Sequence, residues 1–396
     1  MGKIRRALGL MSGTSMDGID IALIETDGET MVRRVAAGGV AYEPAFRQRL
    51  RAALGGAKAI ERRDQRPGDL AAVEAELTRR HAATALKFIG DRMLQPSAID
   101  VIGFHGQTVL HRWEEAAVDF SDLETDGAIA RPPVPTQPFH IGRMLTVQIG
   151  DGQALAAATG IDVVHDLRAA DCAAGGQGAP LVPIYHFAMA AKVPERPIAF
   201  VNIGGVANIT YINRSDSELI AFDTGPGNAM IDDWMLKRTN AMFDDGGTLA
   251  ARGKVHEDYV SAYLRHNYFS APLPKSLDRN AFDLSLIDPL SPEDGAATLT
   301  AFTAAAIARS REYLPEEPRL WVIAGGGRRN RTLMGMLAGL VHNAVVPAEA
   351  LGFDGDAIEA EAWAYLAVRS LDGLPITYPG TTGVASPTTG GILSRA

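Results

Sequence analysis

The chain has 396 residues, of which 46% are hydrophobic and 21% charged, and its formal net charge is −9 at pH 7. That length exceeds what one hydrophobic core normally fills, so we expect at least two domains. The acidic balance argues against a nucleic-acid partner, because such partners usually bind a basic face.

Further features of the composition favour a cytoplasmic protein. The single cysteine, Cys172, excludes an intrachain disulfide and is typical of a reducing compartment. The apolar run near the N-terminus is shorter than the roughly 7–15 residues of a signal peptide. The longest uncharged helix-like stretch, residues 295–308, is shorter than the ~20 residues of a membrane span, so we predict a buried helix there and no membrane partner.

The first motif in the chain is the loop MSGTSMDGID, residues 11–20. Residues 7–25 around it predict a strand, a glycine turn and a second strand in a hairpin. The small residues of such a turn expose N–H groups and hydroxyls that can bind phosphate. The lysine of a GxxxxGK[ST] phosphate loop is missing, so a phosphate here would be held without a built-in ammonium.

A helix-like segment over residues 70–92 precedes the motif FHGQTVLH at residues 104–111. His105, Gln107 and Thr108 are polar groups at the end of an expected strand, which is a frequent ligand position. The histidines lack a zinc spacing and the chain has no CxxC or HExxH, so we expect no zinc site.

Residues 114–140 combine an acidic run with four prolines, which forbid regular structure. We interpret this segment as a proline-rich surface insertion. We expect a first domain over residues 1–140 and a second over residues 141–369, with residues from about 370 to 396 packing back on the first.

Residues 164–186 contain Asp166, Arg168 and Asp171 followed by the flexible segment GGQGAP. A carboxylate beside glycines can act as a general base. A nearby arginine can bind phosphate or hold a carboxylate in place. A helix cap followed by a turn explains the same residues without chemistry, and the residues alone favour that interpretation.

The second half repeats the glycine pattern. Residues 198–212 predict a second hairpin, and residues 219–234 and 320–337 each predict a strand, a glycine loop and a helix. Two halves that each open with a hairpin predict a duplicated α/β architecture with mixed sheets. A tight turn explains any one of the loops at 12–18, 224–228 and 325–327, but three such loops in one chain favour phosphate binding.

Several acids are candidates for the site. Asp17 and Asp223 lie in or beside glycine loops, where a carboxylate can hold Mg²⁺ directly or through water. A turn cap is the alternative for Asp223. In the helix-like segment 356–371, Glu359 and Glu361 point to different sides, so we expect one to face a site and the other to lie on a solvated face.

Taken together, these motifs resemble the anhydro-N-acetylmuramic acid kinase family. The resemblance covers nearly the whole chain, in family order, through GLMSGTSMDGIDIAL (9–23), HGQTVLH (105–111), QIGDGQALA (148–156), DLRAADCAAGGQGAPLVP (166–183), VNIGGVANIT (201–210), FDTGPGNAMID (222–232), KSLDRNAF (275–282), AGGGRRN (324–330) and DAIEAEAWAYLA (356–367). It implies the fold of actin, sugar kinases and Hsp70 nucleotide domains: two duplicated actin-like (ribonuclease H-like) domains with mixed sheets around a nucleotide cleft. Hairpin loops from both halves then clasp the phosphates, so no phosphate-loop lysine is needed.

The resemblance also implies an activity. It predicts a homodimeric, cytoplasmic kinase that uses ATP and Mg²⁺ on 1,6-anhydro-N-acetylmuramic acid in peptidoglycan recycling. Water opens the 1,6-anhydro bridge and O6 takes the γ-phosphate, giving N-acetylmuramate 6-phosphate and ADP. Asp171 matches the family aspartate that activates the water, and Glu359 matches a glutamate on the sugar side.

The matching motifs assign binding residues as well. The nucleotide-binding set is Gly13, Thr14, Ser15, Met16, Asp17, Gly18, Ile19, Asp20, Gly204, Gly205, Asn208, Gly225, Gly227, Asn228, Gly325, Gly326 and Gly327. The substrate-binding set is His105, Gln107, Thr108, Gln153, Arg168 and Glu359, and the metal-binding set is Asp17 and Asp223.

Two other functions compete with this interpretation. Another sugar kinase of the same superfamily would need Asp171 to deprotonate a sugar hydroxyl instead of water. A non-enzymatic nucleotide switch, like actin or an Hsp70 nucleotide domain, would leave the acid-rich GGQGAP segment without a purpose.

Overall fold

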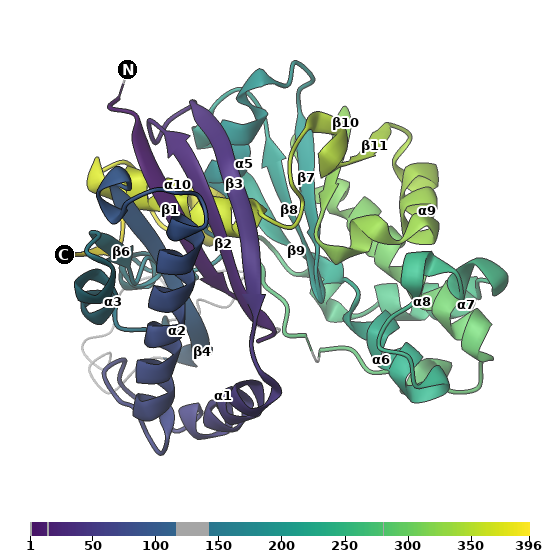
Figure 1. Cartoon of the computed structure of the whole chain (residues 1–396). Coiled ribbons are helices and arrows are strands. Elements are labelled where there is room, and N and C mark those ends of the chain that lie inside the picture. The colour runs from purple at the N-terminus through teal and green to yellow at the C-terminus, as the bar shows by residue number, and fades with distance from the viewer. Residues whose placement is uncertain (1, 14–15, 116–141, 280) are drawn as a thin grey trace, which may run out of the picture.

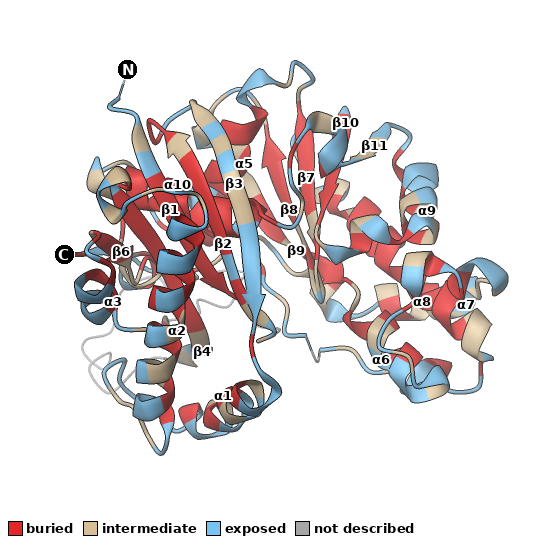
Figure 2. Ribbon diagram, in the orientation of Figure 1, coloured by how far each residue is buried: buried red, intermediate tan, exposed pale blue. Residues whose placement is uncertain are grey.

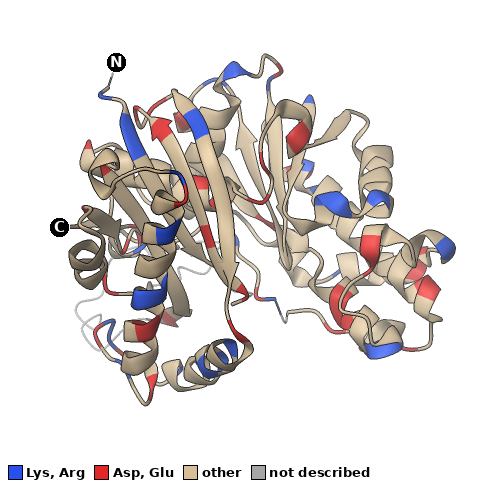
Figure 3. Cartoon of the chain, viewed as in Figure 1, with Lys and Arg blue, Asp and Glu red and all other residues tan. Residues whose placement is uncertain are grey.

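The computed structural model of the chain describes residues 2–13, 16–115, 142–279 and 281–396. The described residues form two mixed sheets, one of seven strands and one of five, with helices around and between them (Figure 1). Acidic and basic residues are spread over both halves of the ribbon (Figure 3).

The first sheet contains the first hairpin. Its strands are β1 (Arg5–Ser12), β2 (Gly18–Thr26), β3 (Val32–Ala41), β4 (Val101–Glu115), β5 (Gly142–Ile149), β6 (Val163–His165) and β12 (Ile392–Ser394). Their order is β12-β6-β4-β1-β2-β3, and β5 pairs with β4. The hairpin predicted over residues 7–25 is therefore confirmed as β1 and β2, which pair antiparallel.

The second sheet contains the second hairpin. Its strands are β7 (Ile198–Ile203), β8 (Val206–Ile212), β9 (Ile220–Pro226), β10 (Leu320–Ala324) and β11 (Ala344–Pro347), in the order β11-β10-β7-β8-β9. The hairpin predicted over residues 198–212 is confirmed as β7 and β8.

The two sheets share one topology. In the first, β1, β2 and β3 are successive antiparallel neighbours, and β4 and then β6 add parallel to β1. In the second, β7, β8 and β9 are antiparallel in the same way, and β10 and then β11 add parallel to β7. The predicted fold class, a duplicated mixed α/β fold of the actin-like kind, is confirmed by this repeated order.

The helices cover both sheets. They are α1 (Pro44–Ala57), α2 (Leu70–Gly90), α3 (Gly152–Thr159), α4 (Ala169–Ala173), α5 (Pro183–Met189), α6 (Ala229–Thr239), α7 (Glu257–Leu264), α8 (Pro292–Arg309), α9 (Arg331–Val341), α10 (Ile358–Leu371) and α11 (Pro379–Thr382). The uncharged stretch 295–308 lies in α8 and is largely buried, as predicted. Among the described helices, none has the length and apolar character needed to cross a membrane.

Helix α10 packs directly on the first sheet. Gly9 of β1 and Gly103 of β4 leave no room for a side chain, because a Cβ at either position would collide with the α10 backbone at Ala360 or Trp363. The hydrophobic core around α10 also takes residues from the second sheet, and the central strands of both sheets are buried (Figure 2). A helix near the C-terminus therefore joins the two halves into one core.

The strands that belong to the first sheet indicate where the first half of the chain ends. Strands β5 and β6 follow residue 140 in the chain but lie in the first sheet, and β12 returns to pair with β6. These pairings favour a boundary after His165 rather than near residue 140, and the division into domains stays a prediction. Residues 116–141, which make up nearly all of the predicted insertion, lie outside the described residues.

Candidate active site

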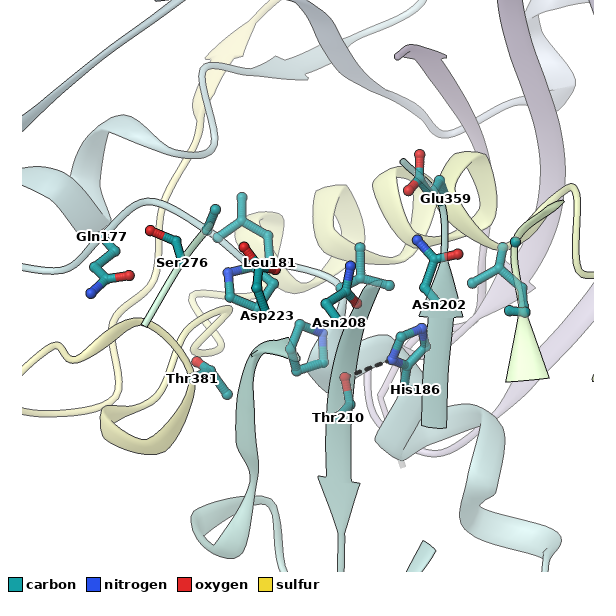
Figure 4. A pocket seen from close by; sticks show the side chains of 18 of the residues that line it. Gln177, Leu181, His186, Asn202, Asn208, Thr210, Asp223, Ser276, Glu359 and Thr381 are labelled. Atoms are coloured by element: carbon teal, nitrogen blue, oxygen red, sulfur yellow. Dashed lines mark hydrogen bonds between the residues drawn. The ribbon is translucent and has the colours of Figure 1, made fainter. Parts of the chain in front are cut away.

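A cleft with a volume of about 410 Å³ has walls from both halves of the chain (Figure 4). Asp20 of β2 comes from the first sheet, and Asn208 of β8 and Gly325 come from the second. Arg168, just before α4, and Glu359 at the start of α10 also line it. The cleft thus brings together residues predicted for nucleotide, metal and sugar.

The glycine turns of the second half meet at one edge of this cleft. The Asn228 N–H donates to the Gly204 carbonyl at 2.7 Å, and the Gly227 N–H donates to the Gly205 carbonyl at 2.9 Å. A Cβ at Gly227 would collide with the Gly204 carbonyl oxygen, so this close approach requires glycine. The hairpin turn and the loop after β9 therefore form one surface.

The triple-glycine loop joins the same surface. Gly325 lines the cleft in a left-handed conformation with φ of 71°, and a Cβ there would collide with Asn202 Oδ1. The Asn228 amide donates to the Ile203 carbonyl at 3.1 Å and lies beside Gly326 and Gly327. Gly225 has a different role, since the space its side chain would fill is taken by Ala306 of α8. Gly225 thus serves packing rather than the cleft.

The first hairpin turn is only partly described. The Met16 N–H donates to the Gly13 carbonyl at 3.0 Å, and the Asp17 carbonyl accepts from Tyr42. Gly18 lies against the β3 backbone at Val40. Thr14 and Ser15, which were predicted to bind nucleotide, lie outside the described residues. Ile19 is 1% exposed and packs in the core, because side chains alternate along β2, so its side chain does not reach a nucleotide.

Two carboxyl groups of the cleft have raised pKa values. Burial raises the pKa of Asp20 to about 6, and the nearby charges of Asp17, Glu359 and Asp356 act in the same direction. Burial also raises the pKa of Asp223 to about 6, although its Oδ2 accepts a hydrogen bond of 2.7 Å from the Leu277 N–H. A cation in the cleft would favour the charged form of both groups.

The predicted base, Asp171, does not line the cleft itself. Its side chain is 1% exposed on α4. Oδ1 accepts from the Gly178 N–H at 2.6 Å, and Oδ2 accepts from the Thr382 hydroxyl at 2.6 Å. The neighbours of these partners in the chain, Gln177 and Thr381, line the cleft itself. Each carboxylate oxygen keeps a further lone pair for a water molecule.

Arg168 connects the cleft to His105. The Arg168 guanidinium lies 3.2 Å from His105 Nε2 and donates to the Gly178 carbonyl at 2.8 Å. Both side chains lie against the Trp363 ring. Burial lowers the pKa of Arg168 to about 10, and burial and the Arg168 charge hold the pKa of His105 well below its usual range. His105 is thus a neutral support for Arg168 and is not among the residues lining the cleft.

Besides His105, three more predicted sugar contacts are not brought to the cleft. Gln107 accepts from the Ser12 hydroxyl at 2.8 Å and donates to the Gly13 carbonyl at 3.2 Å, so it braces the first hairpin. Thr108 accepts from Gln148 at 3.2 Å on the neighbouring strand β5. Gln153 is exposed on α3 and donates to the Arg395 carbonyl at 3.1 Å, which is a contact with the C-terminal segment.

The two glutamates of α10 point to different sides, as their spacing predicts, but only one of the two expected environments is correct. Glu359 lines the cleft with an exposed side chain, and the surrounding protein raises its pKa while the Arg168 charge lowers it. Glu361 was expected on a solvated face, and that expectation is wrong. It is 2% exposed and accepts a hydrogen bond of 2.7 Å from the Tyr185 hydroxyl, because α10 is enclosed on this side as well.

Sequence reasoning missed several residues of the cleft. Asn202, Thr210, His186, Lys275, Ser276 and Asp356 line it. Lys275 lies among the rings of Tyr268 and Tyr313, 4.8 Å and 3.8 Å from their centroids. The alternating polar residues of VANIT and the motif KSLDRNAF were signals for Thr210, Lys275 and Ser276.

Comparisons with known proteins match this chain over nearly its whole length. The family model described as anhydro-N-acetylmuramic acid kinase matches residues 5–129 and 137–395. The anhydro-N-acetylmuramic acid kinase of Agrobacterium fabrum is 50% identical over 402 residues, covering 100% of both chains. That of Brucella canis is 48% identical over 401 residues with the same coverage, and that of Bradyrhizobium diazoefficiens is 50% identical over 391 residues, covering 98% of this chain and 99% of its own.

The repeated α/β sheet topology, together with the full-length family matches, defines a kinase built on the actin-like fold. The full-length matches make the assignment more specific. The chain belongs to the anhydro-N-acetylmuramic acid kinase family.

Proposed function

We propose that the chain uses ATP to convert 1,6-anhydro-N-acetylmuramic acid to N-acetylmuramate 6-phosphate, with ADP as the second product. Family membership over the whole chain supports this activity. The structural observation that carries the proposal is a single cleft in which glycine turns lie on one side and the segment covering Asp171 lies on another. A phosphate site and a carboxylate base are the two parts that the reaction needs.

The glycine turns hold the phosphates of ATP. Gly204 and Gly325 present their backbone to the cleft, and the packed turn of Gly227 and Asn228 supports them. N–H groups that are fixed before the reaction stabilise the charge of a transferring phosphoryl group without reorganisation.

Asp171 activates the water that attacks the anomeric carbon. The Gly178 N–H and the Thr382 hydroxyl fix the orientation of its carboxylate. As the C1–O6 bond breaks, O6 gains negative charge and takes the γ-phosphoryl group. Arg168 and Glu359, on the wall of the cleft, bind the sugar.

A magnesium ion bound with ATP supplies charge neutralisation for the transferring group. Among the described residues, no cluster of three or more His, Cys, Asp or Glu side chains could hold a metal alone. This fits Mg²⁺, which usually takes one or two carboxylates with phosphate oxygens and water. Asp223 and Asp20 line the cleft and fit that role, and the charge of Asp17, on the first hairpin, acts on Asp20.

Family resemblance supports the remaining parts of the proposal. The chain acts in the cytoplasm as a homodimer, in the recycling of peptidoglycan, without nucleic-acid or membrane partners. The net charge of −9 and the single cysteine are consistent with that setting.

The proposal is tested by following ADP release with ATP, Mg²⁺ and a panel of sugars. Turnover with 1,6-anhydro-N-acetylmuramic acid and little with ordinary hexoses is the expected result. Turnover with hexoses alone would favour another sugar kinase of the superfamily. ATP hydrolysis that ignores every sugar would favour a nucleotide switch.

A further inference from the structure

The floor of the cleft consists of uncharged polar side chains. Asn202 of β7, Asn208 and Thr210 of β8, and His186 of α5 lie there together (Figure 4). Burial lowers the pKa of His186 to about 3, so its ring is neutral at physiological pH. The part of the floor around His186 therefore offers hydrogen bonds without charge, unlike the walls that carry Asp20, Glu359 and Arg168, and unlike Asp223, which pairs with Asn208 on the neighbouring strand.

His186 is held rigidly at this floor. Its ring stacks on Phe200, with centroids 4.0 Å apart and an interplanar angle of 18°. Its Nδ1 lies 2.9 Å from the Thr210 hydroxyl (Figure 4). These two contacts fix both the plane and the rotation of the imidazole.

The second ring nitrogen has no such partner. Although His186 is only 3% exposed, its Nε2 forms no hydrogen bond within the part of the chain that the structure describes. Among the described residues, some buried polar atoms are both closed off from solvent and without a partner, but His186 Nε2 is not one of them. Because His186 lines the cleft and Nε2 is not sealed, this nitrogen meets the cleft, where a water molecule or a ligand can be its partner.

We propose that His186 is a further sugar-binding residue, whose Nε2 hydrogen-bonds an uncharged substituent of the bound sugar, either a hydroxyl or the acetamido group. This inference rests on the proposed function. A neutral imidazole has one N–H and one lone pair, and the Thr210 hydroxyl can donate or accept at Nδ1. Nε2 can therefore accept from a hydroxyl or donate to an amide carbonyl.

Anionic groups belong elsewhere in the cleft. The Arg168 guanidinium lines the same cleft and carries a charge, so it is a better partner for an anionic group than a neutral imidazole. His186 thus suits a neutral part of the substrate.

A purely structural role accounts for the stacking and for the Thr210 contact, but it leaves Nε2 without a function. His81 shows what a structural histidine looks like in this chain. It is fully buried, its Nδ1 lies 2.8 Å from the Leu77 carbonyl, and its Nε2 is sealed away from solvent without a partner. It packs edge-on against Phe104 and does not line the cleft. His81 is therefore the matched control.

The test compares His186→Phe, His186→Gln and the control His81→Phe with the wild-type chain. His186→Phe keeps a ring on Phe200 but removes both nitrogens, and His186→Gln keeps an amide that can hydrogen-bond. The KM values for ATP and for 1,6-anhydro-N-acetylmuramic acid are measured, together with sugar binding by calorimetry. If His186→Phe does not fold, His186→Leu, which also lacks both ring nitrogens, takes its place in the test.

We expect His186→Phe to raise the KM and Kd for the sugar about tenfold and to leave the KM for ATP within about twofold. His186→Gln is expected to recover part of the loss, and His81→Phe to change neither constant. Unchanged sugar constants in the folded His186 variants would overturn the inference, as would an equal rise in the KM for ATP. A wild-type chain that neither binds nor converts the anhydro sugar would overturn the proposed function and this inference with it.

Discussion

The Thr382 hydroxyl donates a hydrogen bond of 2.6 Å to the Asp171 carboxylate, across 211 positions of the chain. The Gly178 N–H binds the other carboxylate oxygen at 2.6 Å. The C-terminal segment that carries α11 therefore helps to set the orientation of an aspartate on α4. Because both partners adjoin residues that line the cleft, a movement of either segment changes how Asp171 meets a ligand.

Replacing Thr382 with valine tests this relationship. Thr382→Val removes a donor from a buried carboxylate, so we expect the free energy of unfolding to fall by about 1–3 kcal/mol. We also expect kcat to fall about tenfold at an unchanged KM for ATP, since the base loses one of its two orienting contacts. Urea unfolding and steady-state kinetics measure the two effects.

Thr377→Val is the matched control for that variant. Thr377 is also fully buried, but its hydroxyl has no hydrogen-bond partner in the described part of the chain. We expect this change to leave kcat unaltered and stability equal or higher. Equal losses in the two variants would contradict a specific role for the Thr382–Asp171 bond.

The glycine turns give a second prediction. In Gly227→Ala the new methyl group collides with the Gly204 carbonyl and separates the two turns. We expect the KM for ATP to rise at least about tenfold, with a smaller change in the Kd for the sugar. Nucleotide binding by calorimetry checks this without requiring turnover.

Gly335→Ala serves as its control, since Gly335 lies within α9 and a Cβ there meets nothing within 4 Å. Replacing a helical glycine by alanine at an open position is expected to stabilise the chain by about 0.4–1 kcal/mol. If the two variants bind ATP equally well, the turns around Gly227 are not the phosphate site.

Local features of this fold are visible in the sequence. Apolar runs around Gly204 and Gly205 predict the hairpin of β7 and β8, and glycine after a strand predicts the loops at 225–228 and 325–327. Each depends on neighbours within a few residues, so periodicity and turn chemistry suffice to find it.

Long-range features are not visible in the same way. The pairing of Ser394 with Val163 joins residues more than 200 positions apart, and no local pattern marks it. The burial of Glu361 depends on Tyr185 from another element, and the packing of Gly225 depends on Ala306 of α8. Gln153 lies in a family motif, yet its side chain reaches the C-terminal segment. Burial and side-chain direction are set by tertiary contacts in all these cases.

The buried Glu361 predicts a pH dependence of stability. Burial raises its pKa from 4.5 to about 7. Below the lower value the carboxyl is protonated in both the folded and the unfolded chain. As pH rises towards 7, the unfolded chain releases the proton while the folded chain keeps it, so folding loses stability across this window.

Glu361→Gln removes that dependence, since glutamine stays neutral and its carbonyl can still accept from Tyr185. We expect no difference from wild type at about pH 4 and a stability advantage of about 1–3 kcal/mol for the variant above about pH 7. Urea unfolding over a pH series measures the difference. A difference that stays constant with pH would contradict the raised pKa.

The walls of the cleft come from both halves of the chain, and the segment around Gly178 covers Asp171. We therefore predict that the two halves close around the bound ligands before the reaction. We expect small-angle scattering to show a smaller radius of gyration with sugar and a non-hydrolysable ATP analogue together than with either alone. An unchanged radius in every state would count against closure.

The most direct test of the central claim uses water labelled with heavy oxygen. The chain is incubated in it with ATP, Mg²⁺ and 1,6-anhydro-N-acetylmuramic acid, next to Asp171→Asn, and the products are analysed by mass spectrometry. The account predicts a 6-phosphorylated sugar with label at C1 in the wild type and loss of this product in the variant. An unlabelled phosphosugar, or a labelled one formed equally well by Asp171→Asn, would contradict it.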